Sequence, residues 1–268
     1  MVRHVNFGGR VRFRRSVVAS WSGIGGSRQY STRRLSRPMG QPVVKYEFDF
    51  ALVLSHWRVF VWGTWTTIEM TLIASVAGLC VAVVCAWVKT SGPRWACWIV
   101  NAYIELIRNT PFLVQLFFFF FALPAVGLRW SPFVAALVAM IVNLGAYATE
   151  IIRAGIQSIP RGQIEAGKAL NLKPWQIFRY IVIGPALRTI FPALASQLTL
   201  LMLSSSVVSA ISADDLTSVA SNLQSQTFRS FEIYLCVAAI YLGLAIVMNG
   251  LFKLVRRRFL DYPQQGVT

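Results

Sequence analysis

The chain has 268 residues, of which 56% are hydrophobic and only 13% are charged, and its formal net charge is +16. A soluble domain carries about 25% charged residues, and its helices show polar faces at a 3.6-residue period, which residues 71–88 lack. The composition therefore excludes an ordinary soluble protein and indicates a protein embedded in a membrane.

The positive charge is concentrated in residues 1–38, a basic extension without any acidic residue that carries little structure signal. Nine of the 26 basic residues lie there, so the rest of the chain has 17 basic against 10 acidic residues. Three interpretations stay open: a nucleic-acid-binding arm without a recognisable motif, an organellar transit peptide, or an over-extended gene start with translation beginning at Met39. The nine residues are Arg3, Arg10, Arg12, Arg14, Arg15, Arg28, Arg33, Arg34 and Arg37.

Residues 39–63 form a polar and aromatic lead-in, in which Trp57 and Trp62 favour a helix at the membrane interface. A bilayer-spanning helix needs about 20 mostly apolar residues, and five later stretches meet that length. We predict an all-α integral membrane protein with about five transmembrane helices in one domain, residues 64–258, followed by a C-terminal tail at 259–268. The stretches are 65–88, 95–123, 132–152, 181–210 and 231–254, and Pro111 interrupts the second.

The distribution of charge between the spans predicts the orientation of the chain, because basic residues favour the cytoplasmic side. Loops one and three and the end of the last span are rich in lysine and arginine, whereas loop two has Arg129 alone and loop four has Arg229 beside Asp214 and Asp215. Loops one and three and the C-terminus are therefore expected in the cytoplasm, with the N-terminus outside. A tail of nine arginines would then have to cross the membrane, which favours a start at Met39. We expect the two aspartates to lie in a solvated loop.

Loop three, residues 161–175, carries signals for two short helices between the third and fourth spans. Residues 163–170 favour a helix, with Glu165 near its positive end. Asn171 stands where a helix ends in a left-handed residue, a position for Gly or, next best, Asn. Pro174 suits the first turn of the next helix.

Small side chains in loop three predict a surface that another protein can approach closely. Ala166 and Gly167 keep this surface shallow. The alternative is an ordinary amphipathic connector between two spans. The sequence alone leaves both interpretations open.

Two patterns that would indicate a nucleotide or metal site are incomplete. Residues 162–169 nearly match the phosphate-binding loop G-x-x-x-x-G-K-[ST], but Ala169 lacks the hydroxyl that binds magnesium, and no strand is predicted before it. The four cysteines lie in or beside apolar spans without metal-ligand spacing, which predicts small buried hydrophobic residues. We therefore expect no nucleotide site, metal or cofactor in this chain. The cysteines are Cys80, Cys85, Cys97 and Cys236.

Glu165-Ala166-Gly167, followed by Asn171, resembles the EAA loop of ABC importer permeases, in which Glu-Ala-Ala is followed by Gly at the position of Asn171. Three further segments are similar to the polar amino acid subfamily of these permeases, and the likeness extends from about Gly63 to the C-terminus. These segments are 108–115, which begins Arg-Asn-Thr-Pro; 145–163, which leads into loop three; and 174–180, which begins Pro-Trp-Gln.

The resemblance implies a membrane-spanning permease subunit of an ABC importer for polar amino acids, a multi-pass protein of the bacterial inner membrane. It implies separate ATPase subunits that hydrolyse ATP, a second permease subunit of the same or a sister kind, and an extracytoplasmic solute-binding protein. The other implied partners are the amino acid substrate and membrane lipid, without nucleic acid. The residues implied to contact the ATPase are Gly162, Glu165, Ala166, Gly167, Lys168, Asn171 and Pro174.

The chain departs from the family pattern in four places. Gly167 for Ala and Asn171 for Gly are physically mild, since Asn tolerates the left-handed conformation. Gly184-Pro185 stands where Leu-Pro is usual. Residues 203–206, Leu-Ser-Ser-Ser, stand where relatives often have Lys, a polar residue and Thr-Ser, which weakens any substrate assignment borrowed from them.

Polar and ionisable side chains inside the spans are costly unless they face a cavity or a partner. Residues 108–111 interrupt the second span, which frees backbone groups that must be satisfied within the protein. One interpretation of the polar residues is a translocation cavity near mid-membrane, lined by spans two to four, for a zwitterionic solute. The alternatives are interhelical hydrogen bonding and snorkelling at the cytoplasmic edge, which is favoured for Arg153. We expect Glu69 and Glu105 to be buried partners of cations, and 117–121 to face lipid and neighbouring helices. The candidate pathway residues are Arg108, Thr110, Gln115, Asn143, Glu150, Ser204, Ser205 and Ser206.

A self-sufficient secondary carrier or channel is the competing function class. Such carriers commonly show repeated halves and discontinuous helices with ionisable coupling sites, and five spans without an internal repeat argue against that class. The identity of the substrate stays open among glutamate or aspartate, basic amino acids, glutamine, cystine and opines.

Overall fold

The computed structural model describes residues 48–260, and within this range every regular element is a helix. The predicted all-α class is therefore confirmed. The basic extension at 1–38, the lead-in before residue 48 and residues 261–268 of the predicted tail lie outside the described residues.

The first long helix begins earlier than the apolar pattern predicts. α1 (Ala51–Ser55) is a short turn of helix, and α2 (Trp57–Ser91) follows it as a 35-residue helix. The side chains of Ser55 and His56 hydrogen-bond to the carbonyl of Leu52, at 2.7 and 2.9 Å, and mark the junction. The two tryptophans of the lead-in belong to α2, and not to a separate interfacial helix, because no Pro interrupts the helix after the junction.

The second predicted span is broken at Pro111, as the sequence indicates. α3 (Arg94–Arg108) and the helical segment that begins with α4 (Phe112–Phe117) are bent by 110° relative to each other. Two side chains in the break cap the end of α3: Asn109 Nδ2 donates to the carbonyl of Glu105 at 2.8 Å, and Thr110 Oγ1 donates to that of Leu106 at 2.8 Å. The backbone groups freed by the break thus find partners within the chain.

The remaining spans follow the sequence prediction closely. Among the described residues, four helical stretches are long and apolar enough to cross a membrane, and the broken pair makes a fifth. Besides α2, these stretches are α5 (Pro132–Gln157), the continuous stretch Pro174–Ile211, and α10 (Ser230–Phe259). The shorter elements are η1 (Phe118–Ala122), η2 (Leu123–Val126), α6 (Arg161–Ala169), α7 (Pro174–Gln176), η3 (Ile177–Val182), α8 (Ile183–Ser204), η4 (Ser205–Ile211) and α9 (Leu216–Thr227).

α5 lies at the centre of the bundle and contacts α2, α3, α4 and α8. Small residues such as Ala135, Ala136 and Ala139 are fully buried there, and they let helices approach closely in a membrane, where lipid removes the usual hydrophobic drive. Gly78 of α2 also allows close packing of α2 on α5, since a Cβ at this position would lie 2.8 Å from Leu144 Cδ2. In the aromatic run at 117–121, the middle rings pack against this core and the outer ones are exposed.

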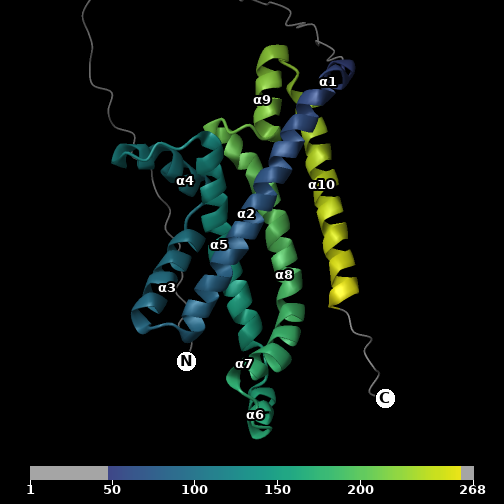
Figure 1. Ribbon diagram of the computed structural model, residues 1–268. Helices are drawn as coiled ribbons and strands as arrows, with labels where there is room; N and C mark the ends of the chain where they lie inside the picture. The colour runs from purple at the N-terminus through teal and green to yellow at the C-terminus, as the bar shows by residue number, and fades with distance from the viewer. Residues whose placement is uncertain (1–47, 261–268) are drawn as a thin grey trace, which may run out of the picture. The chain divides into compact units, whose positions relative to one another are not determined.

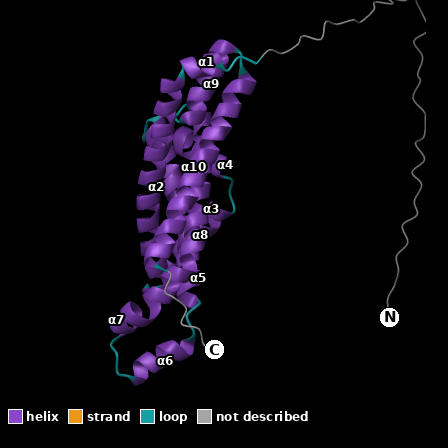
Figure 2. Cartoon of the chain, turned by 90° about the vertical axis from the view of Figure 1, so that its right-hand side faces the viewer, coloured by secondary structure: helices purple, strands orange, loops and turns teal. Residues whose placement is uncertain are grey.

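The two ends of the bundle carry different elements. α1 and α9 lie at one end, whereas α6, α7 and the last turns of α10 lie at the other (Figure 1). The view turned by 90° shows the same separation, with α6 and α7 protruding beyond the long helices (Figure 2). Loop three is therefore a projection from one end of the membrane-spanning bundle.

Candidate functional site

The backbone of loop three is held by a hydrogen-bonded helix end. Asn171 adopts the left-handed conformation predicted for it, with φ of 57°. Its N–H donates to the carbonyl of Lys168 at 2.9 Å, and the next N–H, that of Leu172, donates to the carbonyl of Gly167 at 3.1 Å. These two bonds form a Schellman motif, which ends α6 and turns the chain sharply.

A second cap starts the next helix immediately. Pro174 occupies the first position of α7, as predicted, where its missing N–H costs nothing. The backbone N–H of Lys173 donates to Oε1 of Gln176 at 2.8 Å. The sequence prediction did not assign this role to Gln176, although Gln three residues after a helix start is a known capping signal. The capped turns leave the segment little freedom to change its backbone.

The inner face of loop three packs against the start of the fourth span. Gly167 is buried, and a Cβ there would lie 2.5 Å from Cδ1 of Ile181 and 3.3 Å from Cγ1 of Ile177. The prediction that Gly167 contributes to an open shallow surface is therefore wrong, since this glycine faces inward. Its small size lets α6 lie against η3, in an apolar cluster that includes Ile159 and Leu172.

The outer face of loop three is exposed and carries two large apolar side chains. Leu170 is 75% exposed and Trp175 is 59% exposed. The predicted contact residues Glu165, Ala166 and Lys168 are exposed beside them, as are Gly162, Asn171 and Pro174. Residues 162–169, the near-match to a phosphate loop, lie within α6 and follow another helix rather than a strand. The outer face is suited to a protein contact.

Within the bundle, Gln115 holds the broken span together. Its side-chain amide donates to the carbonyl of Ile107 at 2.7 Å and to both oxygens of Thr110, at 3.0 and 2.9 Å. Its Oε1 accepts a hydrogen bond of 3.0 Å from Asn143 Nδ2 on α5. Gln115 is buried, and these bonds satisfy one carbonyl near the end of α3 and one in the break inside the protein. In this conformation, Gln115 links the break to α5 by hydrogen bonds.

One carboxylate gathers three cations from three helices. Glu150 of α5 lies 2.7 Å from Lys89 Nζ of α2 and 2.7 Å from Arg153 Nη2 on its own helix. Arg108, the last residue of α3, is farther away, with Nη1 at 3.9 Å, and its guanidinium lies 5.6 Å from the ring centroid of Tyr147. The cluster ties α2, α3 and α5 together next to the break.

The structure thus brings five of the eight predicted pathway residues together. Asn143, Tyr147 and Glu150 recur at helical spacing on α5, so they share a face. This face meets Arg108, and Gln115 links it to Thr110. Tyr147 and Lys89 were not predicted as members of this group. The spacing of 143, 147 and 150 would have indicated the tyrosine, whereas the lysine comes from a distant part of the chain.

The three serines lie at a different place, where α8 tightens into the 3-10 helix η4. Ser205 is fully buried, and its hydroxyl donates to the carbonyl of Met202 at 2.6 Å. The hydroxyl of Ser206 donates to the carbonyl of Leu203 at 2.8 Å, and Ser204 is half-buried. η4 also contacts α4 and α5. The serine segment is therefore a second polar region, adjoining the helices of the break.

Two expectations about acidic residues inside the spans are wrong. Glu69 and Glu105 were predicted to be buried beside cations, but both are exposed, and neither forms an ion pair within the described residues. Ile104 and Ile107 explain the orientation of Glu105, because α3 packs through them against Ala146 and leaves Glu105 on the opposite face.

The expectation of a solvated aspartate pair is also wrong for one member. Asp214 is exposed, but Asp215 is fully buried and caps the start of α9. Its carboxylate accepts a hydrogen bond of 2.8 Å from the N–H of Ser218 and one of 3.2 Å from the hydroxyl of Tyr241. Burial raises the pKa of the Asp215 carboxyl, and these hydrogen bonds oppose that rise. Asp215 therefore has a structural role.

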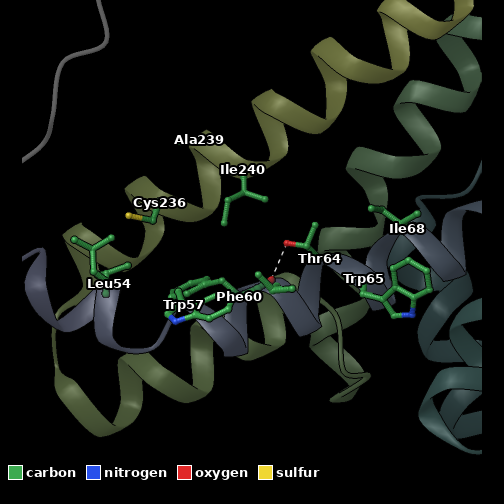
Figure 3. A pocket seen from close by; sticks show the side chains of 11 residues that line it. Leu54, Trp57, Phe60, Thr64, Trp65, Ile68, Cys236, Ala239 and Ile240 are labelled. Atoms are coloured by element: carbon green, nitrogen blue, oxygen red, sulfur yellow. Dashed lines mark hydrogen bonds between the residues drawn. The ribbon is translucent and has the colours of Figure 1, made fainter.

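An apolar groove of about 630 Å³ lies between α2 and α10 (Figure 3). Trp57, Phe60, Trp65 and Ile240 are among its lining residues. The hydroxyl of Thr64, which also lines it, already donates to the carbonyl of Phe60 at 2.7 Å. The groove suits hydrocarbon and offers no partner for a charged solute.

Residues 74–261 match the family described as the inner membrane component of binding-protein-dependent transport systems. The chain belongs to this family. Membership identifies a multi-pass membrane permease of an ABC importer, with an ATPase and a solute-binding protein as its general partners. It gives no support to a self-sufficient carrier.

The permease is also similar to several curated proteins over nearly their whole lengths. It is 32% identical to the glutamine transport system permease protein GlnP of Escherichia coli (strain K12) over 214 residues, which cover 79% of this chain and 98% of that protein. It is 31% identical to the L-cystine transport system permease protein TcyB of Bacillus subtilis (strain 168), over 78% of this chain and 89% of that protein. The nopaline transport system permease protein NocM of Agrobacterium fabrum is 33% identical, with coverages of 77% and 90%.

Solved structures agree with the fold of the permease. The crystal structure of an amino acid ABC transporter with histidines matches with a TM-score of 0.76 and 34% identity, covering 80% of this chain and all of that chain. An inward-facing MetNI methionine ABC transporter matches with a TM-score of 0.63 over 75% of this chain and 95% of its own. At 22% identity, the second likeness supports the fold alone.

Proposed function

We propose that this permease is the membrane-spanning subunit of an ABC importer that moves polar amino acids across the inner membrane, driven by separate ATPase subunits. Relatives named for glutamine, cystine and nopaline, and a solved transporter described with histidines, support a substrate that carries the amino acid backbone. We further propose that the permease has no nucleotide site of its own and pairs with a second copy or a sister permease.

The proposed contact with the ATPase is supported by the exposed surface of loop three, whose helix ends are capped. Leu170 and Trp175 project from a segment whose backbone is fixed by the Schellman motif and the Gln176 cap. Large apolar side chains on a rigid, water-exposed projection are suited to binding a partner. The proposed contact residues of the ATPase are Gly162, Glu165, Ala166, Lys168, Asn171 and Pro174, and the buried Gly167 supports them by packing against η3.

The proposed orientation has loops one and three and the C-terminus in the cytoplasm and the N-terminus outside. It is supported by the basic residues of these loops and by the separation of α6, α7 and the end of α10 from α1 and α9 (Figure 1). The ATPase would then meet the end of the bundle from which loop three protrudes.

We propose that loop three transmits movement from the ATPase to the membrane spans. ATP binding closes the ATPase dimer and displaces α6. Because Gly167 packs against Ile177 and Ile181, a displacement of α6 moves the start of the fourth span with it. The paired permeases then change from inward-facing to outward-facing, accept the amino acid from the binding protein, and release it inside after hydrolysis.

The proposed pathway runs past the break in the second span. Its candidate residues are those that contact one another there, together with the serine segment after α8. The residues are Arg108, Thr110, Gln115, Asn143, Glu150, Ser204, Ser205 and Ser206.

A substitution at Glu165 tests the proposal directly. Glu165 is exposed on α6, so Glu165→Ala should change the free energy of unfolding by less than about 0.5 kcal/mol. We expect the variant to lose most ATP-dependent uptake of a mixture of labelled glutamine, glutamate, arginine and cystine in proteoliposomes that contain the whole transporter. Glu69→Ala, which removes an exposed carboxylate from α2, is the matched control and should retain uptake. Wild-type uptake that persists without the ATPase subunits would contradict the proposal.

A further inference from the structure

The exposed face of α3 carries a polar stripe, although this helix forms the first half of a membrane span and exposes apolar side chains such as Trp98 and Leu106 on the same face. Asn101, Glu105 and Arg108 are exposed, and their spacing of four and three residues aligns them along one side of the helix, which ends at the exposed cap residue Asn109. The opposite side is apolar and packs on α5. A helix that presents charged side chains on its outer side within a span is not suited to lipid contact.

The length of α3 indicates that the charged end of this stripe lies inside the bilayer. Fifteen residues at a rise of 1.5 Å extend about 22 Å, which is less than the hydrocarbon thickness of about 30 Å. Starting from basic loop one at the membrane surface, α3 therefore ends before it reaches the far side. Charges at that depth must face water or a polar partner.

Both charged residues of the stripe have unused binding capacity. Glu105 forms no ion pair within the described part of the chain. Arg108 is the most distant of the three cations around Glu150, at 3.9 Å against 2.7 Å for Lys89 and Arg153. Its side chain is 45% exposed, so the guanidinium can turn its donors toward a second carboxylate.

We infer that Glu105 and Arg108 bind the two charged groups of the amino acid in the pathway, an inference that rests on the proposed function. Residues three positions apart on a helix have Cβ atoms about 5–6 Å apart. An amino acid carries its ammonium and carboxylate on one carbon, so both groups can reach this pair together. The guanidinium of Arg108 matches the fork of a carboxylate, and the carboxylate of Glu105 accepts hydrogen bonds from the ammonium.

Tyr147 and Asn109 position Glu105 and Arg108 without contacting the ammonium or the carboxylate of the substrate. The Tyr147 ring lies beneath the Arg108 guanidinium, 5.6 Å from ring centroid to Cζ, and holds it beside α5. Asn109 caps the carbonyl of Glu105 at 2.8 Å, which fixes the end of the helix that carries both charges. The site thus stands on a rigid helix end at the break.

Binding to the permease–ATPase complex in nanodiscs, without the solute-binding protein, tests the inference. The probes are ¹⁴C-labelled L-glutamine, L-arginine and L-cystine, competed with the amide of each amino acid, which lacks the carboxylate, and its N-acetyl form, which lacks the ammonium. We expect Arg108→Gln and Glu105→Gln each to weaken binding about 10- to 100-fold, as for a lost hydrogen bond to a charged group. Glu69→Gln, the matched removal of an exposed acid on α2, should bind as the wild type does.

The selectivity among competitors separates recognition from folding. In Arg108→Gln the amide should compete as well as the parent amino acid, and in Glu105→Gln the N-acetyl form should do so. The ratio of affinities does not depend on the folded fraction. Wild-type affinity and selectivity in both variants, or weaker binding with unchanged selectivity, would overturn the inference. A wild-type complex that neither binds nor transports any of the probes would instead overturn the proposed function.

Discussion

The ion pair between Lys89 and Glu150 joins the ends of α2 and α5, and its removal should destabilise the permease measurably. The two atoms are 2.7 Å apart, and the side chains are only 15% and 19% exposed. Glu150→Gln keeps the shape of the side chain but removes its charge. Lys89, Arg153 and Arg108 would then remain as three neighbouring cations with no carboxylate among them.

The magnitude follows from the distance and the partial burial. At 2.7 Å and an effective dielectric constant of 20, the Coulomb attraction is about 6 kcal/mol, and desolvation of both groups offsets much of it. Breaking a fully buried pair costs about 3–5 kcal/mol, and water reaches this one. We therefore expect Glu150→Gln to lower the free energy of unfolding by about 2–3 kcal/mol, and the Lys89–Glu150 coupling to be about 1.5 kcal/mol or more.

A double-mutant cycle measures this coupling. Glu150→Gln, Lys89→Met and the double variant would be unfolded in detergent micelles with a graded denaturing detergent, and the helix signal followed. The double variant should lose about 1.5 kcal/mol less than the sum of the single changes. The exchange Glu69→Gln on α2 should stay within about 0.5 kcal/mol of the wild type and serves as the control. A coupling below about 0.3 kcal/mol would refute the reasoning, since the pair would then contribute no more than an exposed one.

Three further substitutions test the local structure. Asn171→Gly should leave the uptake rate unchanged. Asn171→Val should destabilise loop three by about 1–2 kcal/mol, because a β-branched residue resists the left-handed conformation, and should therefore lower the uptake rate. Equal uptake rates in the two variants would contradict this. Gln115→Leu should lower the free energy of unfolding by about 1–3 kcal/mol, since it leaves the carbonyl of Ile107 buried without its donor, and an unfolding midpoint equal to that of the wild type would oppose this account. Burial raises the pKa of Asp215 in the folded state above its usual value of 3.8, so the contribution of this carboxyl to the free energy of unfolding falls as the pH rises from there through the raised pKa. The thermal unfolding temperature of Asp215→Asn should therefore increase relative to that of the wild type as the pH is raised from 4 to 7. A difference between the two temperatures that does not depend on pH would count against the raised pKa.

The sequence by itself determined the features that depend on neighbouring residues. Apolar runs of sufficient length predicted the spans, Pro111 predicted the break, and Asn171 with Pro174 predicted two helices in loop three. Each is a property of the backbone over a few turns, which propensity and hydrophobicity express directly. Motif resemblance to the permease family added the proposal that loop three contacts an ATPase, which no local signal indicates.

Only the tertiary structure decided which side chains meet and which way they face. Lys89 and Glu150 are 61 residues apart in sequence, and Gln115 and Asn143 are 28 apart, so their contacts depend on how α2, α4 and α5 pack. The same packing turns Gly167 inward and leaves Glu105 exposed, and it buries Asp215. The identity of a residue indicates which contacts it can make, but the relative position of whole helices selects the partner, because small residues at their interfaces set how closely and at which register they pack.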